Sequence, residues 1–215
     1  MPARTGLVLH HLNYSRSQRV LWALEELELD YEIVRYSRDP VTRLAPPELK
    51  AVHPLGKSPV LVDGSRTVAE SGAILDYLVR RHGGGRLAPA PDSEDFDDYV
   101  HWLHYGEASA MLPLMLLLYS ARLAEAAAPL TPRIESEIAN HIGYIDASVA
   151  GRSFLVGEDL TAADIQVSFP LEAARAFGKL GDYPAAAAYL ERLEARPAFR
   201  RALERGGPYS LGPRA

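Results

Sequence analysis

The sequence has no cysteine among its 215 residues, and this absence removes several kinds of chemistry. Disulfide bonds, zinc sites built on thiolates and cysteine nucleophiles all need a cysteine side chain, so none of them is available to this chain. Any thiol reaction at this protein must therefore use a thiol that a ligand supplies.

The sequence also lacks an excess of positive charge and a long uninterrupted apolar run. Its 23 Lys and Arg stand against 28 Asp and Glu, whereas nonspecific binding to nucleic acid needs a basic surface. The most apolar segment, 108–121, contains Pro113 and is shorter than a membrane-spanning helix requires. Residues 1–6 lack the apolar core of a signal peptide. We therefore expect a soluble, cytoplasmic protein that binds neither nucleic acid nor membrane.

The first part of the chain predicts a strand, a helix and a second strand. Residues 7–12 and 31–36 have strand-like patterns. Between them, Ser15–Gln18 has the form of a capping box, and the apolar residues that follow it repeat at helical spacing to about Glu28. A strand, helix and strand in so few residues indicate a parallel βαβ unit.

A hairpin and another helix are predicted after a proline-rich stretch. Strands at 60–62 and 67–69 flank Asp63-Gly64, a strong hairpin signal. Ser71 then begins a helix, which gives the order βαβ followed by ββα. We expect an α/β thioredoxin-like domain over residues 1–82 and a glycine- and proline-containing linker over 83–92.

Residues 93–215 predict an all-helical second domain. A helical pattern runs from about Ser93 to Glu125, with a bend expected near Pro113. Further helices are expected to begin at Thr131-Pro132 and at Thr161–Asp164, which has the form of a capping box. Shorter helices are expected toward the end of the chain.

Two segments of the first domain could hold an extended peptide ligand. Pro59 stands directly before a strand and cannot donate a ladder hydrogen bond, so it must begin the strand or lie in a bend. A cis Ser58–Pro59 bond would leave the Ser58 backbone free to pair with a peptide. At the next helix, Ser71 as N-cap would expose backbone N–H groups to an anion, and Glu70 beside it could receive an ammonium group.

The turn Tyr14–Ser17 is the third candidate, because it also precedes a helix. Hydroxyl donors and backbone amides at such a position stabilise a thiolate more than a thiol. Settings of this kind lower a thiol pKa from about 8.5 to roughly 3.5–7.5.

Taken together, these signals resemble the cytosolic glutathione transferases, and the tract around 15–27 is most similar to bacterial and fungal members with a serine-rich first turn. The matching stretches are Leu9–Leu27, His53–Leu61, Val68–Leu75, Phe154–Gly157 and Leu160–Ile165. The resemblance covers nearly the whole chain, and the Ser-Pro and Glu-Ser pairs are its specific part. It implies a thioredoxin-like domain, a helical domain, no metal, and a homodimer that takes glutathione and a small electrophile.

The resemblance also implies roles for individual residues. The Ser58 backbone, held by cis-Pro59, would pair with the cysteinyl part of glutathione, and Glu70 and Ser71 would hold its γ-glutamyl ammonium and carboxylate. Lys57, with His53, would face the glycyl carboxylate. The glutathione-binding candidates are Arg16, Ser17, His53, Lys57, Ser58, Pro59, Glu70 and Ser71.

The group that activates the thiol is left open between several candidates. Ser15 is the first catalytic candidate and Tyr14 the second, with activation by Arg16 or by bound water as alternatives. Cysteine-type members are excluded by composition, and tyrosine-type members carry their hydroxyl earlier, where this chain has His10-His11. Asp164 with Thr161 matches a structural cap of the family.

The second substrate is expected beside the first long helix of the second domain. Its candidate lining is Tyr105, Glu107, Met111 and Met115, of which the last three would share one helical face. The expected reaction is attack of the glutathione thiolate on a small hydrophobic electrophile. A glutathione-dependent isomerase, dehalogenase or peroxidase and a noncatalytic interaction module are the alternatives, although the Ser-Ser-Cys turn of the isomerases is absent.

Overall fold

The computed structural model describes residues 6–207 and 209–211, and the chain forms two compact units. Among these residues, unit 1 consists of 6–86 together with 195–207 and 209–210, and unit 2 consists of 87–194 with 211. The sequence-based division placed everything from residue 93 onward in the helical domain. The structure groups the last helix with unit 1 instead.

The secondary structure follows the predicted order of elements. Unit 1 contains β1 (Leu7–Leu12), α1 (Ser17–Glu26), β2 (Tyr31–Tyr36), α2 (Leu49–Val52), β3 (Val60–Asp63), β4 (Arg66–Ala69), α3 (Ser71–His82) and α9 (Pro197–Gly206). Unit 2 contains α4 (Asp95–Ala108), α5 (Met111–Ser120), η1 (Ala121–Ala127), α6 (Thr131–Val149), α7 (Ala162–Ala176) and α8 (Pro184–Glu194).

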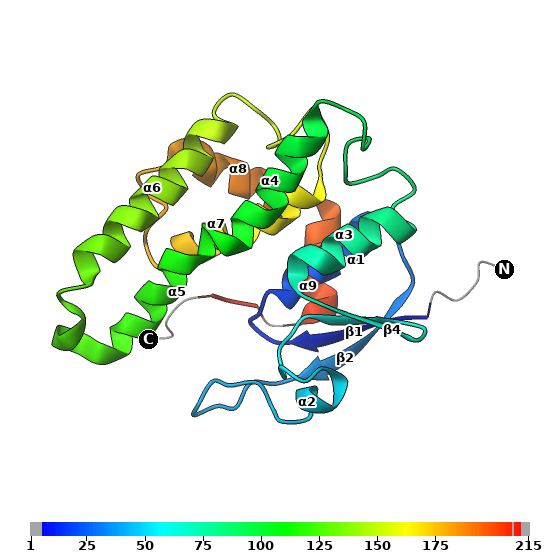
Figure 1. Cartoon of the computed structure of the whole chain (residues 1–215), viewed down its shortest axis with the longest axis horizontal. Coiled ribbons are helices and arrows are strands. Elements are labelled where there is room, and N and C mark those ends of the chain that lie inside the picture. Colours follow the sequence, from blue (N-terminus) through cyan, green and yellow to red (C-terminus); the bar gives the residue numbers. More distant parts are fainter. Residues whose placement is uncertain (1–5, 208, 212–215) are drawn as a thin grey trace. The chain divides into compact units, whose positions relative to one another are not determined.

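In the part of the chain that the structure describes, the strands of unit 1 form one four-stranded sheet with the order β2-β1-β3-β4 (Figure 1). β1 pairs with β2 in parallel, which is the predicted βαβ unit. β3 pairs antiparallel with both β1 and β4, and the β3–β4 connection is the predicted Asp63-Gly64 hairpin. The thioredoxin-like βαβ–ββα arrangement is therefore confirmed.

The core of unit 1 lies between the sheet and α1. Leu7 and Leu9 on β1 are almost completely buried, as are Leu61 on β3 and Val20 and Leu24 on α1. Their spacing explains both elements, because apolar residues two apart face one side of a strand and residues four apart face one side of a helix.

Helix α9 packs against α1 within unit 1 (Figure 1). Phe199 meets Trp22 of α1 edge-on, with ring centroids 5.3 Å apart. Ala198 and Ala202 are buried beside it. A chain segment far away in sequence thus completes the core of the first unit.

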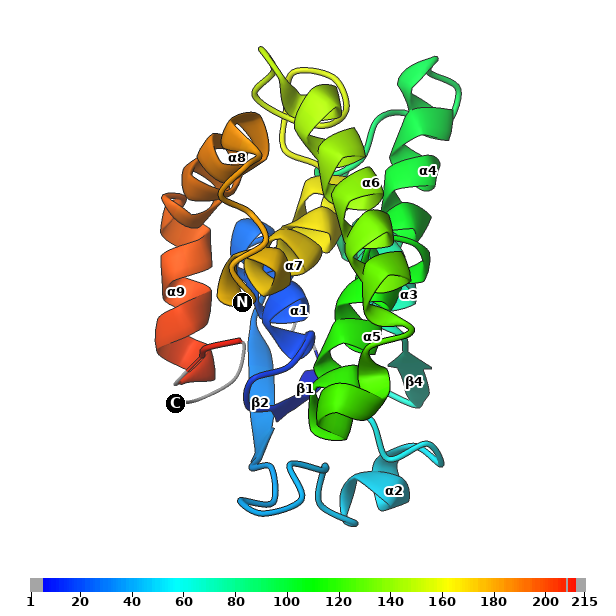
Figure 2. The ribbon, with the colours of Figure 1, turned by 90° about the vertical axis from the view of Figure 1, so that its left-hand side faces the viewer.

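Unit 2 is all-helical, and α7 lies in the middle of it (Figure 2). Nearly every residue of α7 is buried, and the helix contacts α4, α5 and α8. The predicted apolar face of α6 is also buried; it comprises Ile134, Ile138, Ile142, Ile145 and Val149.

The predicted capping box at the start of α7 is confirmed. Asp164 accepts hydrogen bonds from the N–H of Thr161 at 2.7 Å and from its hydroxyl at 2.9 Å. It also accepts from the N–H of Leu155 at 2.8 Å and from the hydroxyl of Tyr189 at 2.6 Å. A buried carboxylate with this many donors acts as a structural centre of unit 2.

The long helical pattern from 93 to 125 breaks earlier than predicted. Helix α4 ends at Ala108 and α5 begins at Met111, while Pro113 lies in the first turn of α5, where its missing N–H costs little. η1 contains Ala124 with φ 48° and ψ −127°.

The stretch Asp95–Ala127, which joins these three elements, is long and apolar enough to cross a membrane by length and composition alone. The segment 108–121 was predicted to be too short to span a membrane, but the longer helical run that contains it is not too short. Core helices of soluble proteins can have the same length and composition, and 28% of the most apolar 18-residue stretch of this run is buried.

Candidate functional site

Three of the predicted segments meet at one edge of the sheet in unit 1. His10 of β1 pairs with Val60 of β3, and Val60 pairs with Ala69 of β4. Because β3 runs antiparallel to both neighbours, the end of β1, the beginning of β3 and the end of β4 lie at the same edge. The Tyr14–Ser17 turn, Ser58-Pro59 and Glu70-Ser71 therefore all follow or precede strands at that edge.

Ser58 is joined directly to the last residues of β1. Its hydroxyl donates to the carbonyl of His10 at 2.9 Å and accepts from the N–H of Leu12 at 3.0 Å. The Ser58–Pro59 peptide bond is cis. Among the described residues, no hydrogen bond joins the Ser58 backbone to another backbone group. The side chain thus fixes the loop to β1, and the half-buried backbone is left for another partner.

Glu70 and Ser71 form the junction between β4 and α3. Glu70 has φ 73° and ψ 123°, a conformation that non-glycine residues rarely adopt, and its side chain is exposed. The N-cap is Glu70 and not Ser71, which is the first helical residue; this corrects the sequence-based assignment. Unusual backbone conformations of this kind gather at functional sites.

A buried arginine, which the sequence reasoning missed, contacts this junction. Arg19 of α1 is 1% exposed, and its Nη1 donates to the Ser71 Oγ at 3.2 Å. The sequence of α1 did not predict that Arg19 is buried, because an arginine three residues into an amphipathic helix is usually solvated.

The hydroxyl of Ser15 is used within the turn that precedes α1. Ser15 is buried; its Oγ donates to the carbonyl of Leu12 at 2.7 Å and accepts from the N–H of Ser17 at 3.2 Å. The predicted capping box does not form: the Ser15 hydroxyl bonds to the N–H of Ser17 and not to that of Gln18, and the side chain of Gln18 is buried without a hydrogen-bond partner among the described residues. The N-cap of α1 is Arg16.

Ser17 faces the protein interior. It is fully buried, and its Oγ lies 2.9 Å from Nδ1 of His11. Burial lowers the pKa of His11 to about 4; the nearby charge of Arg35 adds to this, and a backbone hydrogen bond with Gly206 opposes it. The structure thus brings Ser17 to His11 and not to the surface of the candidate site.

Tyr14 is half-buried, and the loop after β2 holds its backbone. It has φ 52°, and the guanidinium of Arg43 lies 5.7 Å from the centre of its ring. Arg38 donates to the carbonyls of Asn13 and Tyr14, at 3.2 and 3.3 Å, while its N–H donates to the Asn13 side chain. Arg38 and Asn13 therefore shape the turn. The sequence did not predict this contact, because the two residues are 25 positions apart in the chain.

Lys57 and His53 lie beside Ser58 on the loop that leads into β3. Lys57 is exposed and His53 is half-buried. The Nδ1 of His53 accepts from the N–H of Leu55 at 3.4 Å, and the carbonyl of His53 accepts from Gly56 at 2.8 Å. Gly56 has φ 59°, which suits glycine at this turn.

The four residues predicted to line a second site belong to unit 2. Tyr105 is half-buried, its hydroxyl lies 2.6 Å from Nδ1 of His141, and burial raises its pKa. Met111 is buried, whereas Glu107 and Met115 are half-buried. Because the helix is interrupted after Ala108, the predicted continuous face through 107, 111 and 115 does not form.

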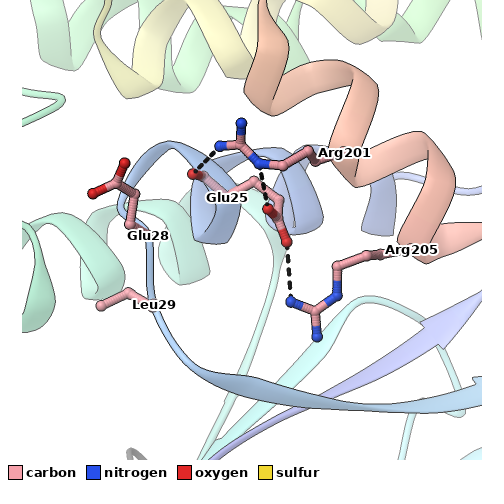
Figure 3. Close-up of a pocket in the computed structure, with 5 residues that line it drawn as sticks. All are labelled: Glu25, Glu28, Leu29, Arg201 and Arg205. Atoms are coloured by element: carbon pink, nitrogen blue, oxygen red, sulfur yellow. Dashed lines mark hydrogen bonds and ion pairs between the residues drawn. The ribbon is translucent and has the colours of Figure 1, made fainter. Parts of the chain in front are cut away.

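A pocket of about 340 Å³ in unit 1 lies between α1 and α9, away from these segments (Figure 3). Its charged residues bind one another: Glu25 accepts from Arg201 at 3.0 Å and from Arg205 at 3.1 Å. Burial alone would raise the pKa of Glu25, but hydrogen bonds from Tyr31 and the two arginines lower it. We interpret this pocket as part of the anchor of α9.

No group of three or more His, Asp or Glu side chains that could hold a metal ion is found across residues 6–207 and 209–211.

Comparisons with known proteins agree with this architecture. Residues 5–80 match the N-terminal domain of glutathione S-transferase, and residues 106–197 match its C-terminal domain. Glutathione S-transferase 3 of Schizosaccharomyces pombe is 35% identical over 93% of this chain and 87% of the relative. Glutathione S-transferase 1 of Saccharomyces cerevisiae is 31% identical over 92% and 94%.

Solved structures give the same result. A glutathione S-transferase from Actinobacillus pleuropneumoniae superimposes with a TM-score of 0.86 at 37% identity, covering 93% of this chain and 92% of that one. A family member from Pseudomonas fluorescens, with two glutathione molecules bound, gives a TM-score of 0.81 at 27% identity and covers 95% of both chains. With both family domains matched in order, this chain belongs to the glutathione S-transferase family.

Proposed function

We propose that this chain binds glutathione at the sheet edge of unit 1 and activates its thiol, so that the thiolate attacks a small hydrophobic electrophile and joins the whole glutathione molecule to it through sulfur. The observation that carries the proposal is the meeting of Ser58, Glu70-Ser71 and the Tyr14–Ser17 turn at that edge. Membership in the family and the glutathione-bound relative from Pseudomonas fluorescens support the choice of ligand.

Each end of a glutathione molecule finds a chemically suitable partner in this proposal. The free Ser58 backbone would pair with the cysteinyl residue, as one strand pairs with another. The first-turn amides of α3 and Ser71 would hold the γ-glutamyl carboxylate, and exposed Glu70 would hold its ammonium group. Lys57 and His53 would face the glycyl carboxylate.

Activation of the thiol would take place at the Tyr14–Ser17 turn. Ser15 remains the first candidate, but its hydroxyl hydrogen now bonds to the carbonyl of Leu12. Stabilising a thiolate would require this hydroxyl to rotate, or a donor from Tyr14 or Arg16 to act in its place. Ser17 is better assigned to packing, since its Oγ contacts the buried His11.

The remaining parts of the proposal concern the electrophile and the assembly. Tyr105, Glu107 and Met115 of α4 and α5 are kept as lining candidates because none of them is fully buried. Met111 is buried and is better assigned to packing. A homodimer, a cytoplasmic location and a role in detoxification stay predictions from the family.

Calorimetric titration with glutathione, followed by the ultraviolet absorbance of the bound thiolate against pH, tests the proposal. We expect binding and a bound-thiol pKa below the free value of about 8.5. Ser15→Ala should raise that pKa by about one pH unit, the loss of about 1.4 kcal/mol of thiolate preference. Ser65→Ala, in the exposed hairpin turn, is the matched control.

The possible outcomes separate binding from activation. No binding of glutathione by the wild-type chain would refute the proposed function. Binding with an unchanged thiol pKa in Ser15→Ala would remove Ser15 from the mechanism and direct attention to Tyr14 and Arg16. Binding without transfer to any electrophile would favour a noncatalytic module.

A further inference from the structure

A buried cation lies behind the first turn of α3. Helices α1 and α3 pack together in unit 1 (Figure 1), and Arg19 of α1 points to Ser71 of α3, with 3.2 Å between Nη1 and Oγ. Both side chains are buried, at 1% and 4% exposure. A guanidinium keeps its charge in proteins, so a full positive charge lies next to Ser71.

The contact determines which way the Ser71 hydroxyl can act. A hydroxyl has one hydrogen to donate and two lone pairs to accept with, whereas arginine only donates. Since Arg19 donates to Oγ, one lone pair of Ser71 is used and its hydrogen must point to another acceptor. Ser71 therefore keeps its hydrogen for an acceptor other than Arg19 at the beginning of α3.

We infer that Arg19 is a positioning residue which makes this end of the site selective for the γ-glutamyl α-carboxylate. The inference rests on the proposed glutathione site. The helix dipole, the first-turn amides, the Ser71 hydrogen and the Arg19 charge all favour an anion, and none of them suits an ammonium group. Glu70, exposed at the neighbouring position, is the residue left for the cation of the ligand.

The test compares glutathione with γ-aminobutyryl-cysteinyl-glycine, which lacks only the α-carboxylate of the first residue. Calorimetry gives the Kd of both ligands for the wild type, Arg19→Met and Ser71→Ala. We expect Arg19→Met to weaken glutathione binding about tenfold and binding of the analogue less than twofold. In the Ser71→Ala background, Arg19→Met should weaken glutathione binding by about threefold or less, because Arg19 acts partly by orienting the Ser71 hydroxyl.

Arg80→Met is the matched control, since Arg80 lies on the exposed side of α3 and pairs with Asp76. It should leave both Kd values unchanged. If Arg19→Met does not fold, Arg19→Lys replaces it: lysine keeps the charge, so discrimination between the two ligands should fall by less than threefold.

Several results would overturn the inference. An equal loss for both ligands in Arg19→Met would show a structural role only. In the Arg19→Lys form of the test, disappearance of the discrimination would overturn the inference, because the charge is kept in that variant and would then not be what selects the carboxylate. Failure of the wild type to bind glutathione would instead refute the proposed function, and the inference with it.

Discussion

Acidification should destabilise unit 1 through His11. This histidine is 4% exposed, and burial lowers its pKa to about 4 from an ordinary value of 6.5. Between those values the unfolded chain binds a proton that the folded chain does not, so stability falls as the pH falls. The contribution of His11 to the free energy of unfolding decreases by about 1.8 kcal/mol from pH 7 to pH 5. Below pH 4 the loss approaches about 3.4 kcal/mol.

Urea unfolding of the wild type and of His11→Gln at several pH values measures this effect. Other groups titrate in the same range, so the quantity to follow is the difference in unfolding free energy between the two proteins. We expect that difference to shrink by about 1.8 kcal/mol between pH 7 and pH 5. Fluorescence of Trp22, which is buried in unit 1, reports the relevant unit.

A pH-independent difference would refute the reasoning, and so would an NMR titration in which the His11 ring gains its proton near pH 6.5. His10→Gln is the control. His10 is half-buried, and burial lowers its pKa as well, but the smaller burial predicts a weaker dependence on pH.

Three further predictions concern packing. Asp164→Ala should cost at least about 3 kcal/mol in urea unfolding, because it leaves the buried donors around it unpaired; a loss below 1 kcal/mol would contradict the network. Gly106→Ala should destabilise by about 1–3 kcal/mol, since a Cβ there would lie 3.1 Å from the Gln166 carbonyl. Gly143→Ala, whose Cβ would lie 3.5 Å from the Tyr183 ring, should be neutral or stabilise by up to about 1 kcal/mol. A larger loss of stability in Gly143→Ala than in Gly106→Ala would refute this account. Glu25→Gln should cost about 1–2 kcal/mol and speed amide exchange in α9 relative to α3, whereas equal rates would argue against the anchor.

Local patterns predicted the elements that depend on local forces. The alternation in β2, the Asp63-Gly64 turn and the Thr161–Asp164 box each act within a few residues. For the same reason the residues at the sheet edge could be named in advance, because Pro59 and Glu70-Ser71 stand at junctions between elements.

The helix starts were predicted less well, because the side chains at these positions do not make the capping contacts that the local motifs imply. Ser15 bonds to Leu12 and Ser17, Gln18 turns into the core, and Glu70 takes the N-cap position that the sequence suggested for Ser71. Pro113 was expected to mark the bend, yet proline is tolerated in a first turn, and the break came at Ser109 and Ala110.

The sequence by itself therefore determined the order of elements, the family resemblance and the absence of a protein thiol. Only the tertiary structure decided that α9 completes unit 1, that Arg38 shapes the Tyr14 turn and that Arg19 reaches Ser71. These contacts join residues 24 to more than 170 positions apart. No short-range pattern encodes such pairs, because they form only when packing brings distant segments together.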